Sequence, residues 1–188
     1  MATIRSGNQS ALLVVDVQVG VVAEAADVSR QIGNIALAVS RARSAGAPVI
    51  WVQHDDEELP RGSAGWQWVP ALVPQVGEVR VYKQFNSSFE RTTLEAELAA
   101  RGVSHIVLAG AVTSWCIRAT AYAALDRGYD LTLLHDAHIA KDMRLEDGSV
   151  VEAANTVREF NVVMQWLSYP GRRCGTARAE QVHFVSMS

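Results

Sequence analysis

The segment VSHIVLAGAVTSWCIRATAYAALDRGYDLTLLH, residues 103–135, decides how this chain folds. Val103–Ala109 is a short and almost wholly apolar run, which is typical of a strand buried on both faces. Cys116–Arg127 has the apolar spacing of a helix, and Gly128 follows at the position where helices commonly end. A second apolar run, Leu131–His135, comes next. A strand, a helix and a strand in this order predict a right-handed crossover between two parallel strands.

The same alternation continues along most of the chain and predicts its fold class. We expect further strands at Ala11–Val17, Val49–Gln53 and Val79–Tyr82, helices at about Val28–Ala45, Thr92–Arg101 and Val150–Leu167, and an edge strand at Gln181–Val185. Strands that alternate with helices favour an α/β fold, here a three-layer, doubly wound and mostly parallel sheet with helices on both faces. The length of 188 residues fits a single domain over residues 1–188.

Composition and charge argue against several classes of protein. Hydrophobic residues make up 49% of the chain, and the formal net charge is −3 with no basic block. No apolar stretch approaches the roughly 20 residues that span a bilayer. We therefore expect neither a nucleic-acid partner nor a membrane partner. The two cysteines form no CxxC pair, and the first ten residues lack the apolar core of a signal peptide, which favours the cytoplasm.

Three chemically active residues follow three of the expected strands. Asp16 lies at the end of the first strand, Lys83 directly after the third, and Cys116 a few residues after the fourth. Ligands of such sheets bind outside the carboxyl ends of the strands, so these residues should share one rim. Asp16 alone could equally cap a loop, and Lys83 alone would be a surface lysine. Together they would form an ion pair, which relieves the cost of burying either charge.

Cys116 is the most informative of the three residues. At the first turn of a helix, free amides and the helix dipole should lower the thiol pKa below its usual value of about 8.5. Thr113 or Ser114 could supply an N-cap oxygen, and Gly110 permits a tight bend ahead of the turn. A buried and inert cysteine is the usual alternative for such a position. Cys174 has no such surroundings, and we interpret it as structural or incidental.

Three separated segments resemble the isochorismatase-like cysteine hydrolases. They are LLVVDVQ (12–18), KQFNSSFERTTL (83–94) and GAVTSWCIRATAYAALDRGYDLTLLHDA (110–137). This family includes nicotinamidases, N-carbamoylsarcosine amidases and other hydrolases of small amides. The resemblance implies a catalytic triad of Asp16, Lys83 and Cys116. It also implies a cis peptide bond between Ala111 and Val112, with the amides of Val112 and Cys116 as the oxyanion hole.

The expected reaction is hydrolysis of a small-molecule amide, carbamoyl or ureido C–N bond through a thioester. Asp16 would take the proton of Cys116, and Lys83 would stabilise the charges around the sulfur. Two alternatives within the family remain: an isochorismatase-type hydrolase, which does not depend on a cysteine nucleophile, and an inactive member that acts as a scaffold. A nucleotide- or flavin-binding module is disfavoured, because the chain has neither GxGxxG nor GxxxxGK[ST].

The loop at residues 54–77 contains the remaining candidates. Nicotinamidases of the family usually carry an Asp/His/His metal site after the second strand. Here His54, Asp55 and Asp56 are adjacent, and no second histidine precedes His105, so we expect no metal and no cofactor. We interpret His54 as a polar residue at a strand end that could face the substrate. The other candidates for a substrate wall are aromatic, although core packing explains them equally well: Trp66, Trp68, Phe85 and Trp115. The loop itself would act as a lid.

The last expected helix bears on assembly. Its interior stripe should be Val150, Ala154, Val157 and Met164, with Phe160 and Trp166 on other faces. Apolar residues on more than one face of a helix suggest a subunit interface, and members of the resembled family commonly assemble. We therefore expect a homodimer or a larger homo-oligomer.

Overall fold

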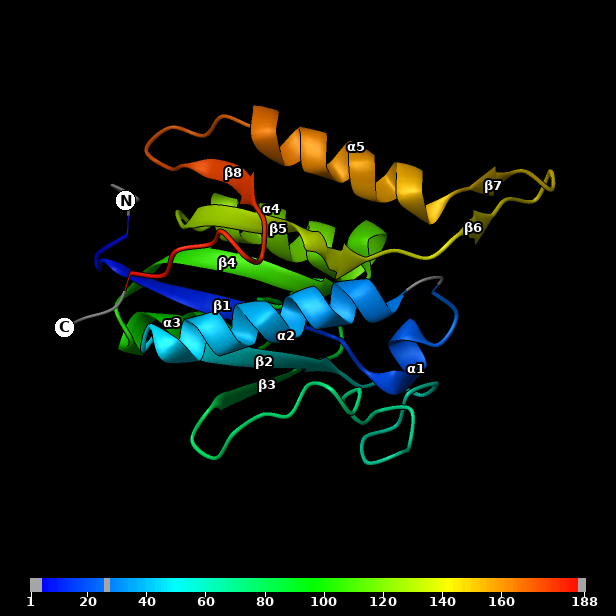
Figure 1. Ribbon diagram of the computed structural model, residues 1–188, viewed down its shortest axis with the longest axis horizontal. Coiled ribbons are helices and arrows are strands. Elements are labelled where there is room, and N and C mark those ends of the chain that lie inside the picture. Colours follow the sequence, from blue (N-terminus) through cyan, green and yellow to red (C-terminus); the bar gives the residue numbers. More distant parts are fainter. Residues whose placement is uncertain (1–4, 26–27, 186–188) are drawn as a thin grey trace.

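A computed structural model describes residues 5–25 and 28–185, and these form a parallel six-stranded sheet covered by helices on both faces (Figure 1). The strand order is β3-β2-β1-β4-β5-β8. The strands are β1 Gln9–Val15, β2 Val49–His54, β3 Val79–Lys83, β4 Val103–Ala111, β5 Asp130–Ile139 and β8 Cys174–Ala177. The helices are α1 Val19–Val22, α2 Val28–Ser44, α3 Leu94–Ala100, α4 Arg118–Asp126 and α5 Ala153–Trp166.

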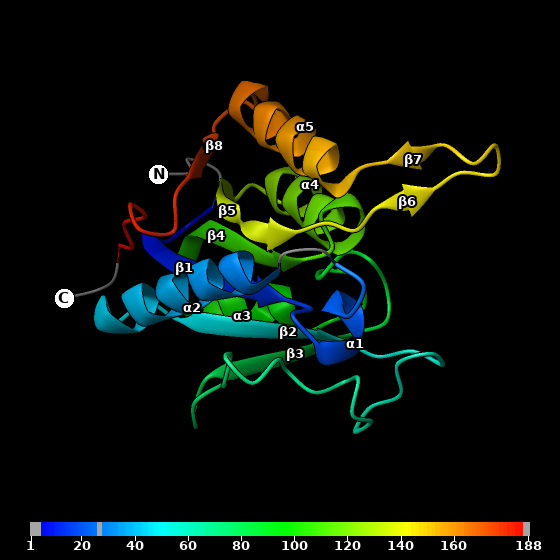
Figure 2. The same cartoon turned by 45° about the vertical axis from the view of Figure 1, so that its right-hand side comes forward.

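The alternation of side chains along β1 explains the layers. Every residue of β1 is buried, and Leu13 and Val15 face the cluster formed with α3, α4 and α5. Leu12 and Val14 face the opposite cluster, which includes the buried side of α2. Figure 2 shows α2 and α5 on opposite sides of the strands. Burying each such Leu or Val contributes about 1.5–3 kcal/mol, and β1 contributes to both cores. The predicted three-layer α/β fold is therefore confirmed.

The edge of the sheet differs from the expectation. Gln181–Val185 is not a strand, and the edge position next to β5 is taken by β8, paired in parallel with Leu131 opposite Cys174. Val185 instead lies beside the start of β1, where its carbonyl accepts a hydrogen bond from the Ser10 amide at 2.8 Å. The sequence of β8, CGTA, has almost no apolar signal, so its strand conformation comes from pairing with β5.

The last helix is also shorter than expected. Val150–Val151 forms strand β7, which pairs with β6 Met143–Arg144 in a hairpin that projects from the molecule (Figure 1). The Asp142 carboxylate accepts a hydrogen bond from the Ala153 amide at 2.8 Å and so fixes the helix start. The buried stripe of α5 is Thr156, Phe160 and Met164. Of the expected stripe, Met164 is confirmed, whereas Val150 and Ala154 are exposed and Val157 is half-buried. Trp166 is 81% exposed.

The carboxyl ends of the strands carry the expected candidates. The strand β1 ends at Val15, so Asp16 is the first residue beyond it, with a left-handed φ of 51°. Lys83 is the last residue of β3. The strand β4 ends at Ala111, and the Ala111–Val112 peptide bond is cis. No helix among the described residues is long and apolar enough to cross a membrane.

Candidate active site

The sheet brings Asp16, Lys83 and Cys116 into direct contact. Lys83 Nζ lies 2.6 Å from Asp16 Oδ2 and 3.2 Å from Cys116 Sγ. The Lys83 side chain is 0% exposed and that of Asp16 is 1% exposed, so water does not screen this ion pair. Lys83 also donates a hydrogen bond to the backbone carbonyl of Phe85 at 3.1 Å. The ammonium group is thus held at a fixed position between a carboxylate and a sulfur atom.

Close approach of β1 and β4 sets the positions of two of these residues. Gly110 has a φ of 132°, and a Cβ atom there would come 2.1 Å from the carbonyl oxygen of Val15. Only glycine therefore permits β4 to pass this close to the end of β1. On the β1 side, the Asp16 amide donates to the Val52 carbonyl at 2.9 Å. Aspartate is among the residues that tolerate a left-handed φ, so the turn after Val15 can aim a carboxylate at Lys83.

Cys116 lies on a turn with an unusual conformation. Residues Thr113–Ile117 form a π-helical turn that continues into α4, and the amides of Trp115 and Ile117 both donate to the Val112 carbonyl. No side chain caps this turn, so the expected N-cap was wrong. The Thr113 hydroxyl is instead bonded to His138 Nδ1 at 2.9 Å, and Ser114 Oγ is buried without a partner among the described residues. We call Val112–Ile117 the Cys116 turn.

Burial dominates the electrostatics of the three residues. Burial and the neighbouring Asp16 carboxylate raise the pKa of the Cys116 thiol to about 12, against the opposing influence of Lys83. Burial also raises the pKa of Asp16, although Lys83 pulls it down. Burial lowers the pKa of Lys83, but the attraction of Asp16 and Cys116 outweighs it, so the pKa is raised. The expected low pKa of Cys116 was therefore wrong, and the resting sulfur carries a proton at neutral pH.

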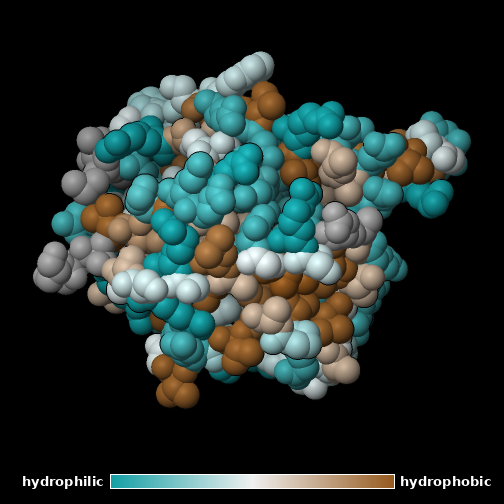
Figure 3. Space-filling model, in the orientation of Figure 1, coloured by the Kyte–Doolittle hydropathy of each residue, from teal (hydrophilic) through white to brown (hydrophobic). Residues whose placement is uncertain are grey.

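The contact between these residues opens into a cavity of about 740 Å³. Its floor includes Asp16, Val112 and Cys116. Two of the aromatic and polar candidates line it as expected, namely Trp115, which is 55% exposed, and His54. One wall comes from the loop after β2, through Asp56, Glu58, Leu59, Pro60, Ser63 and Gly65. Another comes from α1 through Gly20 and Val21, and Figure 3 shows apolar side chains gathered around α1 at the lower right.

The structure places the other aromatic candidates away from this cavity. Trp68 is half-buried and packs edge-on against the buried Trp51, with ring centroids 5.1 Å apart, at the core on the α2 side. Trp66 stacks on Tyr82 at 6.0 Å. Phe85 lies beside the Arg91 guanidinium and contributes only its carbonyl to the Lys83 ammonium. The positions of these residues in the sequence could not distinguish side chains that pack against the core from side chains that line the cavity, because all of them are aromatic and follow strands.

Lining residues that the sequence analysis did not single out include two with polar side chains, Lys141 and Asn86. Lys141 follows β5 and lines the cavity, with its ammonium 3.7 Å from the Glu24 carboxylate. Asn86 lies three residues after Lys83 and also lines the cavity. The signal for Lys141 was present, because it follows the carboxyl end of β5 as Lys83 ends β3.

His54 is held by hydrogen bonds on both ring nitrogens. Its Nε2 lies 2.9 Å from Asp56 Oδ2, and its Nδ1 lies 3.3 Å from Lys83 Nζ. An ammonium can only donate, so Nδ1 accepts from Lys83 and Nε2 carries the proton that Asp56 accepts. Among residues 5–25 and 28–185, no group of three or more His, Cys, Asp or Glu side chains is arranged to hold a metal ion.

Comparisons with known proteins show the family of this chain. A protein-family model described as an isochorismatase domain matches residues 10–166. A streptothricin hydrolase of Streptomyces noursei is 36% identical over 140 residues, which are 71% of this chain and 50% of that protein. The chain spans about half the length of the curated relatives it matches.

Solved structures share the whole fold. An isochorismatase from Pseudomonas putida KT2440 matches with a TM-score of 0.83 and 25% identity, over 93% of this chain and 90% of that one. The N-carbamoylsarcosine amidase of Thermoplasma acidophilum matches with a TM-score of 0.72 over 93% of this chain and 99% of that one. At 23% identity this second likeness is one of fold. Because the family model covers most of the parallel sheet and its rim, the chain belongs to the isochorismatase-like family of hydrolases.

Proposed function

We propose that this protein is a cysteine-dependent hydrolase that cleaves a C–N bond of a small amide, carbamoyl or ureido compound. The observation that carries the proposal is the placement of Lys83 Nζ 2.6 Å from Asp16 and 3.2 Å from Cys116, both of which line an open cavity. A thiol, a carboxylate and a fixed cation in contact are what covalent acyl transfer needs. The family likeness supports hydrolysis, and one relative of the same fold is named as an amidase.

In the proposed first half-reaction, Asp16 removes the Cys116 proton as the sulfur attacks the substrate carbonyl carbon. The raised pKa of the thiol requires such a base, because little thiolate exists at neutral pH. The electron pair of the C=O bond moves to oxygen, and the amides of Val112 and Cys116 stabilise that oxyanion. Collapse of the intermediate breaks the C–N bond, and the leaving amine takes the proton from Asp16.

In the second half-reaction, Asp16 accepts a proton from water as the water oxygen attacks the thioester carbon. Collapse breaks the C–S bond, and the sulfur takes the proton back from Asp16. Lys83 keeps its positive charge throughout, since its raised pKa favours the ammonium. It stabilises whichever of Asp16 and Cys116 is negative at each step. No cofactor enters this scheme.

The cavity lining suggests which substrates fit. Trp115 offers an aromatic face next to the sulfur, which suits a compact planar amide. Carboxylates at Asp56 and Glu58 and the Lys141 ammonium lie around the wall, so polar substituents can be paired there. The test is release of ammonia or amine from nicotinamide, carbamoyl amines, ureido compounds and maleamate-type acids. Mass spectrometry of the protein during turnover would detect an acyl group on Cys116.

The Cys116→Ala variant decides between this function and its rival. Its hydrolysis of amides should fall to background, while Cys174→Ala remains active. The likeness to an isochorismatase of 25% identity favours cleavage of a vinyl ether as the second candidate. That reaction does not depend on a cysteine nucleophile, so Cys116→Ala would retain it. A protein that hydrolyses neither class, and whose Cys116 reacts with iodoacetamide no faster than Cys174, would be a scaffold.

We also propose that the chain is a single domain that works in the cytoplasm as a homodimer or larger homo-oligomer. Both cysteines are free, as expected of a reducing compartment. Trp166 on α5 and the hairpin residues Leu145 and Val150 are exposed apolar groups. These groups lie at both ends of α5, where they are candidate contacts with a second copy of the chain. Light scattering after size-exclusion chromatography measures the assembly, and a purely monomeric mass would contradict it.

A further inference from the structure

A buried histidine on β5 contacts the Cys116 turn. His138 Nδ1 lies 2.9 Å from the Thr113 hydroxyl, and His138 is only 1% exposed. His138 pairs with Gly110 across β4 and β5, and Ile139 pairs with Ala111, so the ring stands next to the cis peptide bond. The pairing of β4 with β5 changes register between Leu108, which is opposite Leu133, and Gly110, which is opposite His138. This irregularity brings His138 to its position.

The second ring nitrogen connects His138 to α5. His138 Nε2 lies 2.9 Å from Asn161 Oδ1, and Asn161 Nδ2 donates to the His135 carbonyl at 3.0 Å. The His135 carbonyl can only accept, so the Asn161 nitrogen faces it and the Asn161 oxygen faces His138. His138 Nε2 must therefore carry the ring proton. Its Nδ1 is then an acceptor, and the Thr113 hydroxyl is the donor.

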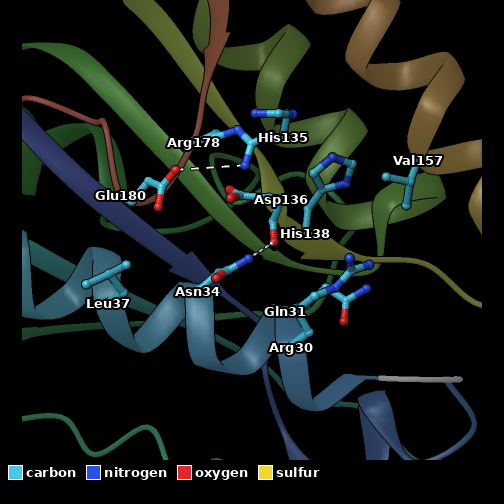
Figure 4. A pocket seen from close by; sticks show the side chains of 10 residues that line it. All are labelled: Arg30, Gln31, Asn34, Leu37, His135, Asp136, His138, Val157, Arg178 and Glu180. Atoms are coloured by element: carbon cyan, nitrogen blue, oxygen red, sulfur yellow. Dashed lines mark hydrogen bonds and ion pairs between the residues drawn. The ribbon is translucent and has the colours of Figure 1, made fainter.

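The surroundings of His138 keep this pattern in place. The Phe160 ring meets the imidazole edge-on, with centroids 6.3 Å apart. Burial lowers the pKa of His138 to about 4, so the ring is neutral and Nδ1 is free to accept. Figure 4 shows that His138 also borders a cavity of about 420 Å³, which is lined by residues of α2, β5 and α5 and by Arg178 and Glu180.

We infer that His138 is a positioning residue, which accepts a hydrogen bond from Thr113 and thereby fixes the direction of the Val112 and Cys116 amides. Thr113 lies between these two residues, and it begins the turn that carries the sulfur. No side chain caps the turn, and the Thr113–His138 bond ties its first residue to β5 in addition to the contact between Lys83 and Cys116. The inference rests on the proposed function, since it assigns the amides to an oxyanion.

The first test compares Thr113→Val, which removes the hydroxyl but keeps the shape, with Thr113→Ser, which keeps the hydroxyl. Losing one oxyanion donor costs about 100- to 1,000-fold in kcat, so misdirecting the pair should cost about tenfold or more. We expect Thr113→Val to lower kcat about tenfold or more with KM within about twofold, and Thr113→Ser to restore most of the rate. Equal rates in both variants would overturn the inference.

A matched control exists at the other end of the sheet. Thr132 Oγ1 lies 2.8 Å from His105 Nε2, which is a histidine–threonine bond of the same kind between β4 and β5. His105 lies six positions before Ala111 on β4, which is on the order of 20 Å at about 3.3 Å per residue. Thr132→Val should leave kcat unchanged. If Thr132→Val lowers kcat as much as Thr113→Val, the Thr113–His138 bond only supports the fold.

Variants of His138 itself give a second, independent comparison. In His138→Asn, the side-chain oxygen can take the place of Nδ1 and accept from Thr113. In His138→Gln, the amide reaches the place of Nε2 and leaves Thr113 without its acceptor. We expect the Asn variant to retain more of kcat than the Gln variant. The reverse order would contradict a role for the Nδ1 acceptor.

A readout without substrate separates this inference from the proposed function. In a Cys174→Ala background, iodoacetamide labels Cys116 at a rate that depends on where the turn holds the sulfur. We expect Thr113→Val to change this rate and Thr132→Val to leave it unchanged. If the wild-type protein hydrolyses no amide but this contrast appears, the proposed function fails and the positioning by His138 stands. If Thr113→Val changes neither rate, the positioning role fails.

Discussion

Replacing Lys83 with methionine isolates the energetic role of the buried ion pair. Methionine has nearly the same length as lysine but no charge, so Asp16 would be left buried without its cation. Breaking a buried pair by removing one partner destabilises a protein by about 3–5 kcal/mol. Here Lys83 Nζ and Asp16 Oδ2 are 2.6 Å apart and both side chains are buried, so solvent does not weaken their attraction.

The double variant Asp16→Asn/Lys83→Met provides the reference. Asparagine tolerates the left-handed φ of 51° at position 16, so the backbone is not a confounding factor. With neither charge present, the double variant should recover about 2 kcal/mol or more of the loss seen in Lys83→Met. Residues in contact deviate from additivity by about 0.5–3 kcal/mol, so the expected coupling is at the upper end of that range.

Thermal and urea unfolding at one fixed protein concentration measure these differences. For a chain of this size, 1 kcal/mol shifts Tm by about 2–4 °C, so Lys83→Met should lose roughly 6–20 °C. Lys83→Met, Asp16→Asn and the double variant should all lose amide hydrolysis, so recovered stability should not come with recovered catalysis. If the stability losses of the two single variants simply add in the double variant, the ion pair is not coupled as the structure indicates.

Three further predictions concern pH, packing and the substrate wall. The Cys116 thiol has a pKa of about 12 in the folded protein, whereas an unfolded thiol ionises near pH 8.5. In a Cys174→Ala background, the free energy of unfolding should therefore fall between about pH 9 and 12, by up to about 1.4 kcal/mol per pH unit. Cys116→Ala should reduce that slope, as urea unfolding at each pH would reveal; an unchanged slope contradicts the raised pKa. Gly110→Ala should lower the free energy of unfolding by about 3 kcal/mol or more, because its Cβ would meet the Val15 carbonyl at 2.1 Å. The control Gly102→Ala, whose Cβ would make only ordinary contacts, should lose about 1–2 kcal/mol. Trp115→Ala should raise KM for planar amides several-fold in steady-state assays, and an unchanged KM would remove Trp115 from the substrate wall.

The sequence predicted the layers of the fold because local patterns encode them. The strand of Gln9–Val15 is apolar on both faces, and this pattern alone requires helices on both sides of the sheet. The glycines that follow α2 and α4, Gly46 and Gly128, likewise locate the carboxyl ends of these helices within a few residues. By contrast, β8 has no apolar pattern of its own, and its place at the edge follows only from pairing with β5.

For the candidate site, the sequence determined which residues share a rim, because the carboxyl ends of parallel strands must meet at one edge. Asp16, Lys83 and Cys116 could be grouped in this way without coordinates. Only the tertiary structure decided the chemistry of that group. The pKa of Cys116 rises rather than falls, because burial and the distance to Asp16 depend on how separate segments pack. The contact of His138 with Thr113 was equally beyond the sequence, since it arises where an irregularity in β5 meets β4, and no local pattern records such a contact.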